Sequence, residues 1–313
     1  MNSTPFSLET NREKFPRVLL LPGVHALGCV VGDLVVPIEE VRMSETVKFR
    51  ASSVGNLLVG GNAITEKQLA KLDELQARKD NPDAKPLTAN MQAELDELIA
   101  KRDGEFEFGA TAMSYIRECW MRNKYGYDEP LVSNEILKGL MCEDEVIGVI
   151  SRQIHGGFRV KNDDWFEDDF FTGTPDILIG EFVEDAKASW TLRTFIETRR
   201  PDPLYYAQGQ VYMALTKRKR FRLAHVLVDT PNELIDEEKK RLYFRFNCDE
   251  ENLIYRELVK KLDMMHRIAH KIPEKDRVKL FEFEINHKYL DDLRLRVKQA
   301  RVVYAAMSLG VDF

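Results

Sequence analysis

The spacing of hydrophobic and polar positions changes several times along the chain, and each change marks an expected element. Residues 1–60 carry short apolar runs broken by turn signals at Pro22-Gly23 and Gly60-Gly61, which is typical of strands joined by turns. Over residues 64–103 the apolar positions take on helical spacing, with many charges and hardly any aromatic side chains. We therefore expect a strand-rich start followed by a helical segment.

The helical segment at residues 64–103 contains an internal repeat with a period of 23 residues. The run Leu72-Asp73-Glu74-Leu75 returns as Leu95-Asp96-Glu97-Leu98. Each copy starts with a threonine in N-cap position, and Thr65 has Gln68 three residues on, which is the spacing of a capping box. Because prolines in the stretch 81–86 break the helix between the copies, the segment predicts an inserted αα-hairpin.

The rest of the chain alternates further helices with strands. Helical spacing recurs over residues 109–125, 134–151, about 204–216, 250–272 and 286–308. Strand patterns occupy about 154–188 and the apolar run 224–228. This interleaving predicts an α/β fold with a central mixed β-sheet flanked by helices. We expect one domain over 1–313, with the hairpin at 64–103, a functional core at 109–230 and C-terminal helices at 250–313.

The composition is that of a globular protein with an acidic balance. The 313 residues are 44% hydrophobic and 31% charged, and the formal net charge is −6. A sizeable core can therefore be buried beneath a charged surface. Since phosphate binding depends on Lys and Arg, the acidic total argues against a general nucleic-acid coat but is compatible with a local basic cleft.

Neither the cysteines nor the most apolar stretch indicates a metal cluster or a membrane segment. The cysteines lack the close pairs of a zinc or iron–sulfur site; they are Cys29, Cys119, Cys142 and Cys248. The stretch Val18–Val36 is interrupted by Pro22 and Asp33 and lacks the basic start of a signal peptide. We therefore expect a cytoplasmic protein with reduced thiols and no membrane association.

Two carboxylates and a lysine are expected to meet in the strand-rich block. Residues 174–180 form a strand that ends in a turn, and residues 182–187 form its antiparallel partner. Side chains two apart in a strand share a face, so Asp185 and Lys187 point the same way, whereas Glu184 and Ala186 point the other way. The hairpin brings Asp176 beside Asp185.

This arrangement is typical of a cation site. Carboxylates this close repel each other unless a cation lies between them, and Mg²⁺ is the usual choice for phosphate chemistry. The Ala186 carbonyl is a further candidate ligand. Lys187 would orient or deprotonate an attacking water, or stabilise negative charge on a phosphate. The alternative is that Asp-x-Lys forms an ordinary surface ion pair.

Two helices carry further polar candidates. In residues 134–151, Glu143 falls in the stripe formed by Ile136, Leu140, Ile147 and Ile150, where a carboxylate is costly unless it is paired or binds a metal. The alternative places Glu143 at the edge of that stripe.

In the helix at about 204–216, Gln208 and Tyr212 are one turn apart on a face with Leu204, Val211 and Leu215. A glutamine on an apolar stripe needs hydrogen-bond partners and can position a metal ligand, a water or a phosphate oxygen. The alternative is an ordinary amphipathic helix with tyrosines at its edge.

The motif Pro-Asp, eight residues, Asp-x-Lys is the signature of the PD-(D/E)xK nuclease superfamily. With Gly139–Glu143 and the Gln208-x-x-x-Tyr212 helix, residues 109–230 resemble its RecB-like and phage lambda-type (YqaJ-like) exonuclease branch. The resemblance implies a restriction-endonuclease-like core. It implies Mg²⁺ or Mn²⁺, two ions per site, held by Glu143, Asp176, Asp185 and the Ala186 carbonyl. By the same resemblance Lys187 is catalytic, and Gln208 and Tyr212 support the site.

The resemblance also implies partners, and it has departures. It suggests duplex DNA ends as substrate, a single-strand annealing protein as partner, and a homotrimer. Ser52 and Ser53 resemble the N-terminal element that handles a DNA end in this branch. However, the first helix motif lacks the histidine of many RecB-type enzymes, the cysteine spacing does not support an iron–sulfur cluster, and no GxxxxGK[ST] helicase motif is present.

Basic and aromatic residues near the motif are candidates for DNA contact. Arg199, Arg200, Lys217 and Arg218 are either phosphate clamps or ordinary solvated charges. The aromatics either stack on frayed bases or belong to the core; they are Trp190, Phe195, Tyr205 and Tyr206. The hairpin at 64–103 is either a surface packing arm, or a subunit contact or DNA-guiding arm.

Three functions are compatible with these residues. The first is a metal-dependent exonuclease that resects duplex DNA ends in phage-type recombination. The second is an endonuclease of restriction or structure-specific type, for which the same carboxylates and lysine would serve. The third is a non-catalytic DNA-end-binding protein of the same fold, which the full set of expected side chains disfavours.

Overall fold

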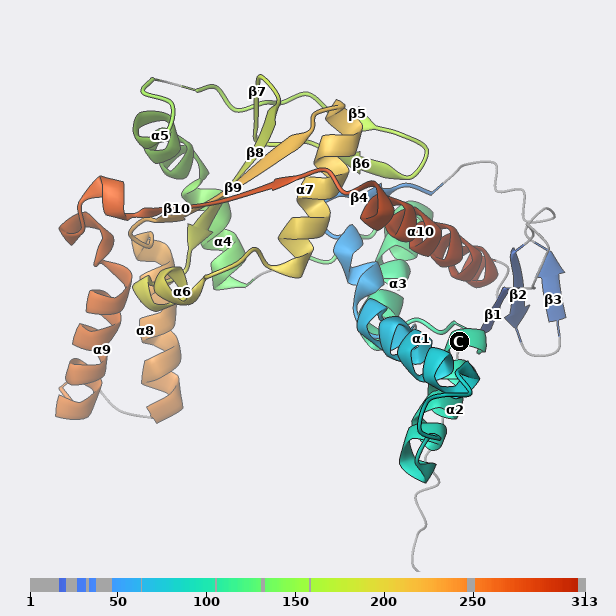
Figure 1. The fold of residues 1–313 in the computed structure, drawn as a ribbon. Coiled ribbons are helices and arrows are strands. Elements are labelled where there is room, and N and C mark those ends of the chain that lie inside the picture. The colour runs from blue at the N-terminus through green and yellow to red at the C-terminus, as the bar shows by residue number, and fades with distance from the viewer. Residues whose placement is uncertain are drawn as a thin grey trace, which may run out of the picture. The chain divides into compact units, whose positions relative to one another are not determined.

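A computed structural model shows two compact units within the chain (Figure 1). The structure describes residues 17–20, 27–31, 34–37, 47–62, 64–104, 106–130, 133–157, 159–246 and 251–308. The first unit comprises residues 1–47, 56–127 and 294–313, and the second comprises 48–55 and 128–293. The expected turn at Pro22-Gly23, together with Asp33 and Cys248, lies outside the described residues.

The first unit contains the expected αα-hairpin. Helices α1 (Glu66–Asp80) and α2 (Ala89–Asp103) pack through a leucine cluster, which consists of Leu72, Leu75, Leu95 and Leu98. Thr65 and Gln68 form the predicted capping box, and Thr88 caps α2. The other elements are α3 (Ala110–Tyr125), the C-terminal part of α10 (His287–Ser308), and an antiparallel sheet of β1 (Arg17–Leu20), β2 (Leu27–Val31) and β3 (Leu34–Pro37).

The second unit is built on a mixed four-stranded sheet in the order β10-β9-β8-β7 (Figure 1). The strands are β7 (Ile177–Ile179), β8 (Phe182–Ser189), β9 (Arg220–Leu227) and β10 (Val278–Glu284). β8 pairs antiparallel with β7 and parallel with β9, and β9 pairs antiparallel with β10. A small second sheet is formed by β4 (Phe49–Arg50), β6 (Phe171–Gly173) and β5 (Phe166–Glu167).

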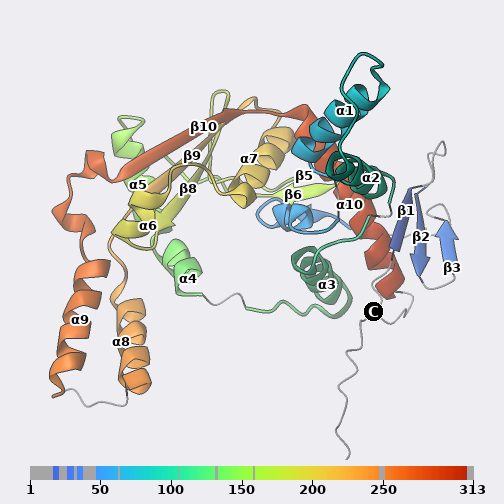
Figure 2. The ribbon, with the colours of Figure 1, turned by 60° about the horizontal axis from the view of Figure 1, so that its bottom comes forward.

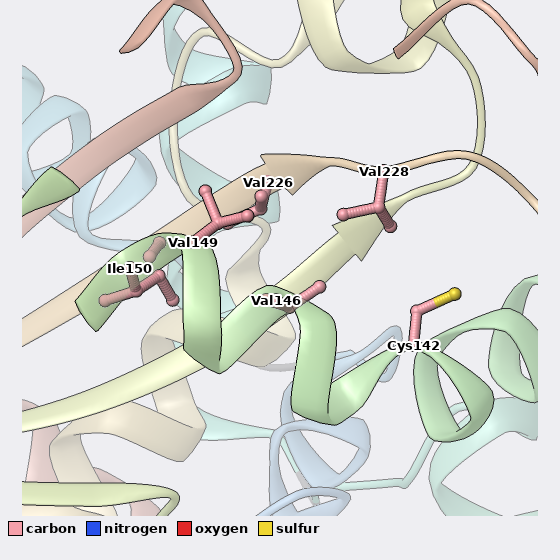
Figure 3. Close-up of a cluster of buried hydrophobic side chains, with 7 residues drawn as sticks. Cys142, Val146, Val149, Ile150, Val226 and Val228 are labelled. Carbon is pink, nitrogen blue, oxygen red and sulfur yellow. The ribbon is translucent and has the colours of Figure 1, made fainter. Parts of the chain in front are cut away.

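Helices cover both faces of the four-stranded sheet. They are α4 (Asn134–Met141), α5 (Glu143–Gln153), α6 (Leu192–Glu197) and α7 (Pro203–Thr216). Two further helices, α8 (Asn232–Phe246) and α9 (Leu253–His266), run side by side and pack on each other (Figure 2). One face of β9 packs on α5 through Val226 and Val149 (Figure 3). The opposite face packs on α7, where a Cβ atom on Gly209 would lie 2.7 Å from the Phe221 ring. The α/β fold with a central mixed sheet is therefore confirmed.

One expected helix is two helices. The predicted helix at 134–151 breaks at Cys142, so Ile136 and Leu140 are 43% and 67% exposed, and the apolar stripe proposed for this segment is wrong for its first half. The physical reason is Lys138, which is 1% exposed and faces the sheet instead. Its ammonium donates to the carbonyl oxygens of Ser189, Trp190 and Val228 at 2.8, 3.0 and 2.9 Å.

The remaining expectations concern the cysteine thiols, membrane-spanning segments and the list of elements. Cys119 and Cys142 are buried free thiols, and burial raises the pKa of Cys119 to about 11. Among the described residues, no helix is long and apolar enough to cross a membrane. Helix α8 and strand β10 are additions to the elements predicted from the sequence.

Candidate active site

The β7–β8 hairpin places the two aspartates as its alternation predicts. Asp176 immediately precedes β7, and Asp185 lies on β8 just past the last β7–β8 pair, Ile177 opposite Glu184. The turn contains Gly180 at a φ of +53°, a conformation that favours glycine. Asp185 and Lys187 share the face of β8 that meets α7, whereas Glu184 on the opposite face is held by His155 and Arg222.

Three hydrogen bonds hold the Thr174-Pro175-Asp176 segment in place. Asn162 donates its backbone N–H to the Asp176 carbonyl at 2.7 Å and its side-chain amide to the Pro175 carbonyl at 3.0 Å. Tyr212 donates its hydroxyl to the Thr174 carbonyl at 3.0 Å. Because the backbone on both sides of Asp176 is anchored, its carboxylate is presented in one position.

Close packing brings Tyr212 to this segment. A Cβ atom on Gly173 would lie 2.6 Å from Cε1 of Tyr212 and 3.0 Å from Cβ of Ala51. Only a residue without a side chain therefore fits between α7 and the strand that leads to Asp176.

Asp185 is 2% exposed and lies at the centre of the site. Gln208 donates its amide to Asp185 Oδ1 at 3.2 Å, and the same amide lies 3.2 Å from the Tyr212 hydroxyl. Asp185 Oδ2 lies 2.7 Å from Lys187 Nζ, yet no donor in the described part of the chain reaches this buried oxygen with hydrogen-bond geometry. Gln208 and Tyr212 thus link Asp185 to the Thr174 carbonyl, two residues before Asp176, through one chain of hydrogen bonds.

The charges of this group act strongly on one another. Burial, together with the negative charge of Asp185, raises the pKa of Asp176 to about 7. Burial acts to lower the pKa of Lys187, but the charges of Asp185 and Asp176 outweigh it, so this pKa is raised above its ordinary value. Lys187 is therefore an ammonium, and Asp176 holds its proton more tightly than an ordinary aspartate does.

The donor set fits a divalent cation. Asp185 Oδ2 is a buried, charged oxygen whose partner in the described structure is Lys187 Nζ at 2.7 Å, and Asp176 stands beside it. Ala186 donates its backbone N–H to Asp176 Oδ2 at 2.9 Å. Since the N–H and C=O groups of a strand residue point to the same edge, the Ala186 carbonyl also faces the Asp176 side. These three groups supply the oxygen ligands that Mg²⁺ and Mn²⁺ prefer.

Glu143 lies at the start of α5 but is engaged elsewhere. Its Oε2 accepts from Lys161 Nζ at 2.7 Å, and its side chain is 30% exposed rather than part of a buried stripe. The Lys161 ammonium also feels the negative charge of Asp176. Among the described residues, no group of three or more His, Cys, Asp or Glu side chains stands together as metal ligands. Lys161 thus stands between Glu143 and the aspartates.

The candidate DNA contacts divide into near and distant groups. Arg199 and Arg200 lie exposed in the loop between α6 and α7, which lines a cavity with Tyr205. Tyr205 in turn lies beside Lys187, 5.2 Å from Nζ to the ring centroid.

The second basic cluster lies at the other end of the strands. Arg218 donates to the Gly180 carbonyl in the β7–β8 turn, and Lys217 directly precedes it. Strand register sets Arg220 opposite Phe182. That position is three residues from Asp185, about 10 Å along the strand. Lys217 and Arg218 are thus not brought to the aspartates.

Ser52 and Ser53 follow β4, which pairs with β6 just before Thr174. Among the aromatic candidates, Tyr205 alone contacts Lys187 in the described structure. The others pack in the protein: Trp190 on His266, Tyr206 on Phe283 and Tyr289, and Phe195 in a buried cluster.

Three residues at the site are not singled out by the sequence. Lys161 and Asn162 sit in a loop without periodicity, so no pattern points to them. His225 lies opposite Lys187 in the β8–β9 register and is 8% exposed. The available signal was a polar residue within the apolar run 224–228. Burial, followed by the charges of Lys187 and Lys279, lowers the pKa of His225 to about 4.

Comparison with known proteins supports the fold. No family model and no curated protein matches the chain. Among solved structures, a phage-related exonuclease from Haemophilus somnus 129PT has a TM-score of 0.55 at 19% identity, covering 86% of this chain and 98% of that one. An alkaline exonuclease from Laribacter hongkongensis has a TM-score of 0.47 at 13% identity, covering 86% and 93%. The chain therefore has the mixed α/β fold of the first of these structures.

Proposed function

We propose that this protein is a divalent-metal-dependent deoxyribonuclease of the PD-(D/E)xK type. The observation that carries the proposal is the buried hairpin site, in which Asp176 and Asp185 lie side by side and Lys187 Nζ lies 2.7 Å from Asp185 Oδ2. A surface ion pair would not explain this arrangement, because Asp185 is 2% exposed and is held by Gln208 from a second element. The identity of the metal, Mg²⁺ or Mn²⁺ in one or two ions, belongs to the proposal.

The residues have distinct roles in hydrolysis of a phosphodiester. Asp176, Asp185 and the Ala186 carbonyl would hold the cation, which when bound polarises the phosphate and lowers the pKa of a water. Lys187, whose ammonium lies 2.7 Å from Asp185 Oδ2, would stabilise the negative charge that develops on the phosphate or orient the attacking water. Gln208 fixes Asp185, and Tyr212 acts as a positioning residue through the Thr174 carbonyl.

Glu143 can act as a metal ligand only after Lys161 moves away from it. Their ion pair is part-buried, with side chains 30% and 39% exposed, so the lysine can turn to solvent or to a DNA phosphate. Glu143 is then free to join the aspartates as a further ligand.

We further propose that the substrate is the end of a duplex and that the enzyme is an exonuclease. The fold shared with the Haemophilus somnus structure, described as a phage-related exonuclease, supports this choice over an endonuclease. A role in phage-type recombination, with a single-strand annealing protein as partner, and a trimeric assembly are part of the same proposal.

The test is cleavage of linear duplex DNA with titrated Mg²⁺ or Mn²⁺. We expect cleavage that EDTA abolishes, and an Asp185→Asn variant that binds the metal at least about tenfold more weakly by calorimetry, because a charged ligand is lost. The control is Asp236→Asn, an exposed position on α8. Cleavage by wild-type protein in EDTA, or unchanged metal affinity in Asp185→Asn, contradicts the proposal.

A further inference from the structure

A cavity of about 510 Å³ lies beside the catalytic lysine. Its lining includes Arg199, Arg200, Asp202, Tyr205 and His225. Tyr205 contacts Lys187, and His225 is the register partner of Lys187 on β9, so the cavity adjoins the position of the scissile phosphate. Its volume is in the range of small-molecule sites, which run from about 300 to 1,000 Å³.

His225 gives this cavity an unsatisfied polar group. The imidazole is 8% exposed, and its Nε2 atom is buried without a hydrogen-bond partner among the described residues. Its ring packs between Tyr205 and Phe281, with centroids 5.9 and 5.8 Å away. A buried polar nitrogen left unpaired is costly, so an occupant whose binding uncovers Nε2 and supplies a donor or acceptor would remove that cost.

The charges around the cavity favour an anionic occupant. Arg199 and Arg200 are exposed, and neither makes an ion pair within the described part of the chain. Two carboxylates also line the cavity, and each has a partner: Asp202 accepts the Leu204 N–H as the N-cap of α7. Glu197 likewise binds Arg193 at 2.8 Å. The loop therefore offers two guanidinium groups that can bind a phosphate, and the Tyr205 ring and the His225 imidazole line the same cavity.

From these contacts we infer that the cavity is a nucleotide subsite for the residue next to the scissile phosphate. Arg199 and Arg200 bind its phosphate, Tyr205 packs against its base or sugar, and His225 Nε2 makes a hydrogen bond to it. The inference rests on the proposed function, because the chemistry it serves is hydrolysis at Asp176 and Asp185. It adds His225 and Tyr205 as residues that contact substrate.

The test uses thymidine 5′-monophosphate as the probe, with thymidine and inorganic phosphate as the other two ligands. Binding is measured by titration calorimetry on the full chain in EDTA, so that no step depends on metal or turnover. We expect the mononucleotide to bind at least about tenfold more tightly than either fragment, because the subsite recognises both parts. In ¹⁵N-histidine-labelled protein, the His225 ring signals should shift with the mononucleotide.

Two variants test the residues that we assign to the subsite. We expect His225→Phe and the double variant Arg199→Ala/Arg200→Ala each to weaken mononucleotide binding about tenfold or more. Since His225 is buried and its variant can disturb folding, the exposed arginine pair supplies an independent test. Arg245→Ala, an exposed arginine on α8 that is not among the residues lining the cavity, is the matched control and should bind as wild type does.

The outcomes separate the subsite from the proposed function, because wild-type cleavage of linear DNA with Mg²⁺ is measured in parallel. Cleavage together with unchanged mononucleotide affinity in both variants overturns the subsite alone. Equal affinity for phosphate and mononucleotide also overturns it, since the cavity is then a simple anion site. Loss of mononucleotide binding in the variants, without DNA cleavage by wild type, shows that the cavity binds a mononucleotide but overturns the nuclease assignment and, with it, the place of the cavity beside a scissile phosphate.

Discussion

At the scale of single residues, the site depends on short-range geometry. Side chains alternate along a strand with a period of two, so Asp185 and Lys187 share a face in any strand that contains them. One tight turn then suffices to bring Asp176 alongside, and the structure has that turn at Gly180. Lys161 and Asn162 arrive from a loop whose path depends on the whole fold, so no local pattern predicts them.

Replacement of Lys187 by Met tests the catalytic assignment. We expect cleavage to fall by about 10²- to 10⁴-fold, because the ammonium that stabilises the phosphate charge is gone while an unbranched side chain of similar length remains. Duplex affinity, measured by fluorescence anisotropy in Ca²⁺, should stay within a few-fold of wild type. Lys219→Met, an exposed lysine before β9, is the control. A Lys187→Met enzyme with wild-type turnover would exclude Lys187 from the chemistry.

At the scale of elements, the sequence predicts those whose signal is local. The αα-hairpin follows from its leucine repeat and threonine caps, and α7 follows from its apolar face. Helix α8 is not predicted from the sequence because its only buried residues are Leu234 and Ile235, which are too few to form a recognisable apolar stripe. The alternation Phe281-Glu282-Phe283-Glu284 was an available signal for β10. The break at Cys142 could not be predicted, since it depends on carbonyl groups of distant strands that bind Lys138.

Those carbonyl contacts make Lys138 a stability determinant. Burial lowers its pKa to about 8, which leaves the ammonium protonated at neutral pH and able to donate to three carbonyl groups. Lys138→Met leaves these acceptors without a donor, so we expect a loss of about 3 kcal/mol in the free energy of unfolding by urea denaturation. Leu140→Ala on the same helix is the control, with an expected change below about 0.5 kcal/mol because Leu140 is exposed. A larger loss in Leu140→Ala than in Lys138→Met would restore the apolar-stripe interpretation.

The packing of α7 on β6 gives a second element-scale prediction. In Gly173→Ala the new methyl group overlaps Tyr212, which must move away from the Thr174 carbonyl. We expect a loss of about 1–3 kcal/mol in stability and a decrease in cleavage rate, because Asp176 loses an anchor. Gly139→Ala, where a Cβ atom meets nothing within 4 Å, should be neutral or slightly stabilising. Denaturation and cleavage assays on both variants check this, and equal behaviour of the two would contradict the role given to Gly173.

At the scale of the whole molecule, the net charge does not favour DNA binding, so the attraction of DNA has to come from residues near the candidate site. The net charge is −6, and the described site itself adds carboxylates, so DNA must be attracted locally. The arginines beside the site supply such a local attraction, whereas Arg220 and Arg222 are occupied by Glu282 and Glu184. Because each neutralised phosphate adds about −0.9 to the slope of log affinity against log salt, affinity that depends on the two arginines beside the site should fall with a slope of only about −2.

The distinction between an exonuclease and an endonuclease belongs to the same scale, because it concerns how DNA reaches the site rather than which residues cut it. With Mg²⁺, we expect linear duplexes to be degraded progressively from their ends while a sealed, relaxed circle of the same sequence survives. The circle carries every internal phosphodiester of the linear form, so its survival can only reflect the need for an end. A circle nicked once and a circle linearised by a restriction enzyme are the matched substrates, followed on gels and by separate 5′ and 3′ end labels. Digestion of the sealed circle at the linear rate would replace the exonuclease proposal with an endonuclease, while leaving the roles of Asp176, Asp185 and Lys187 as they stand.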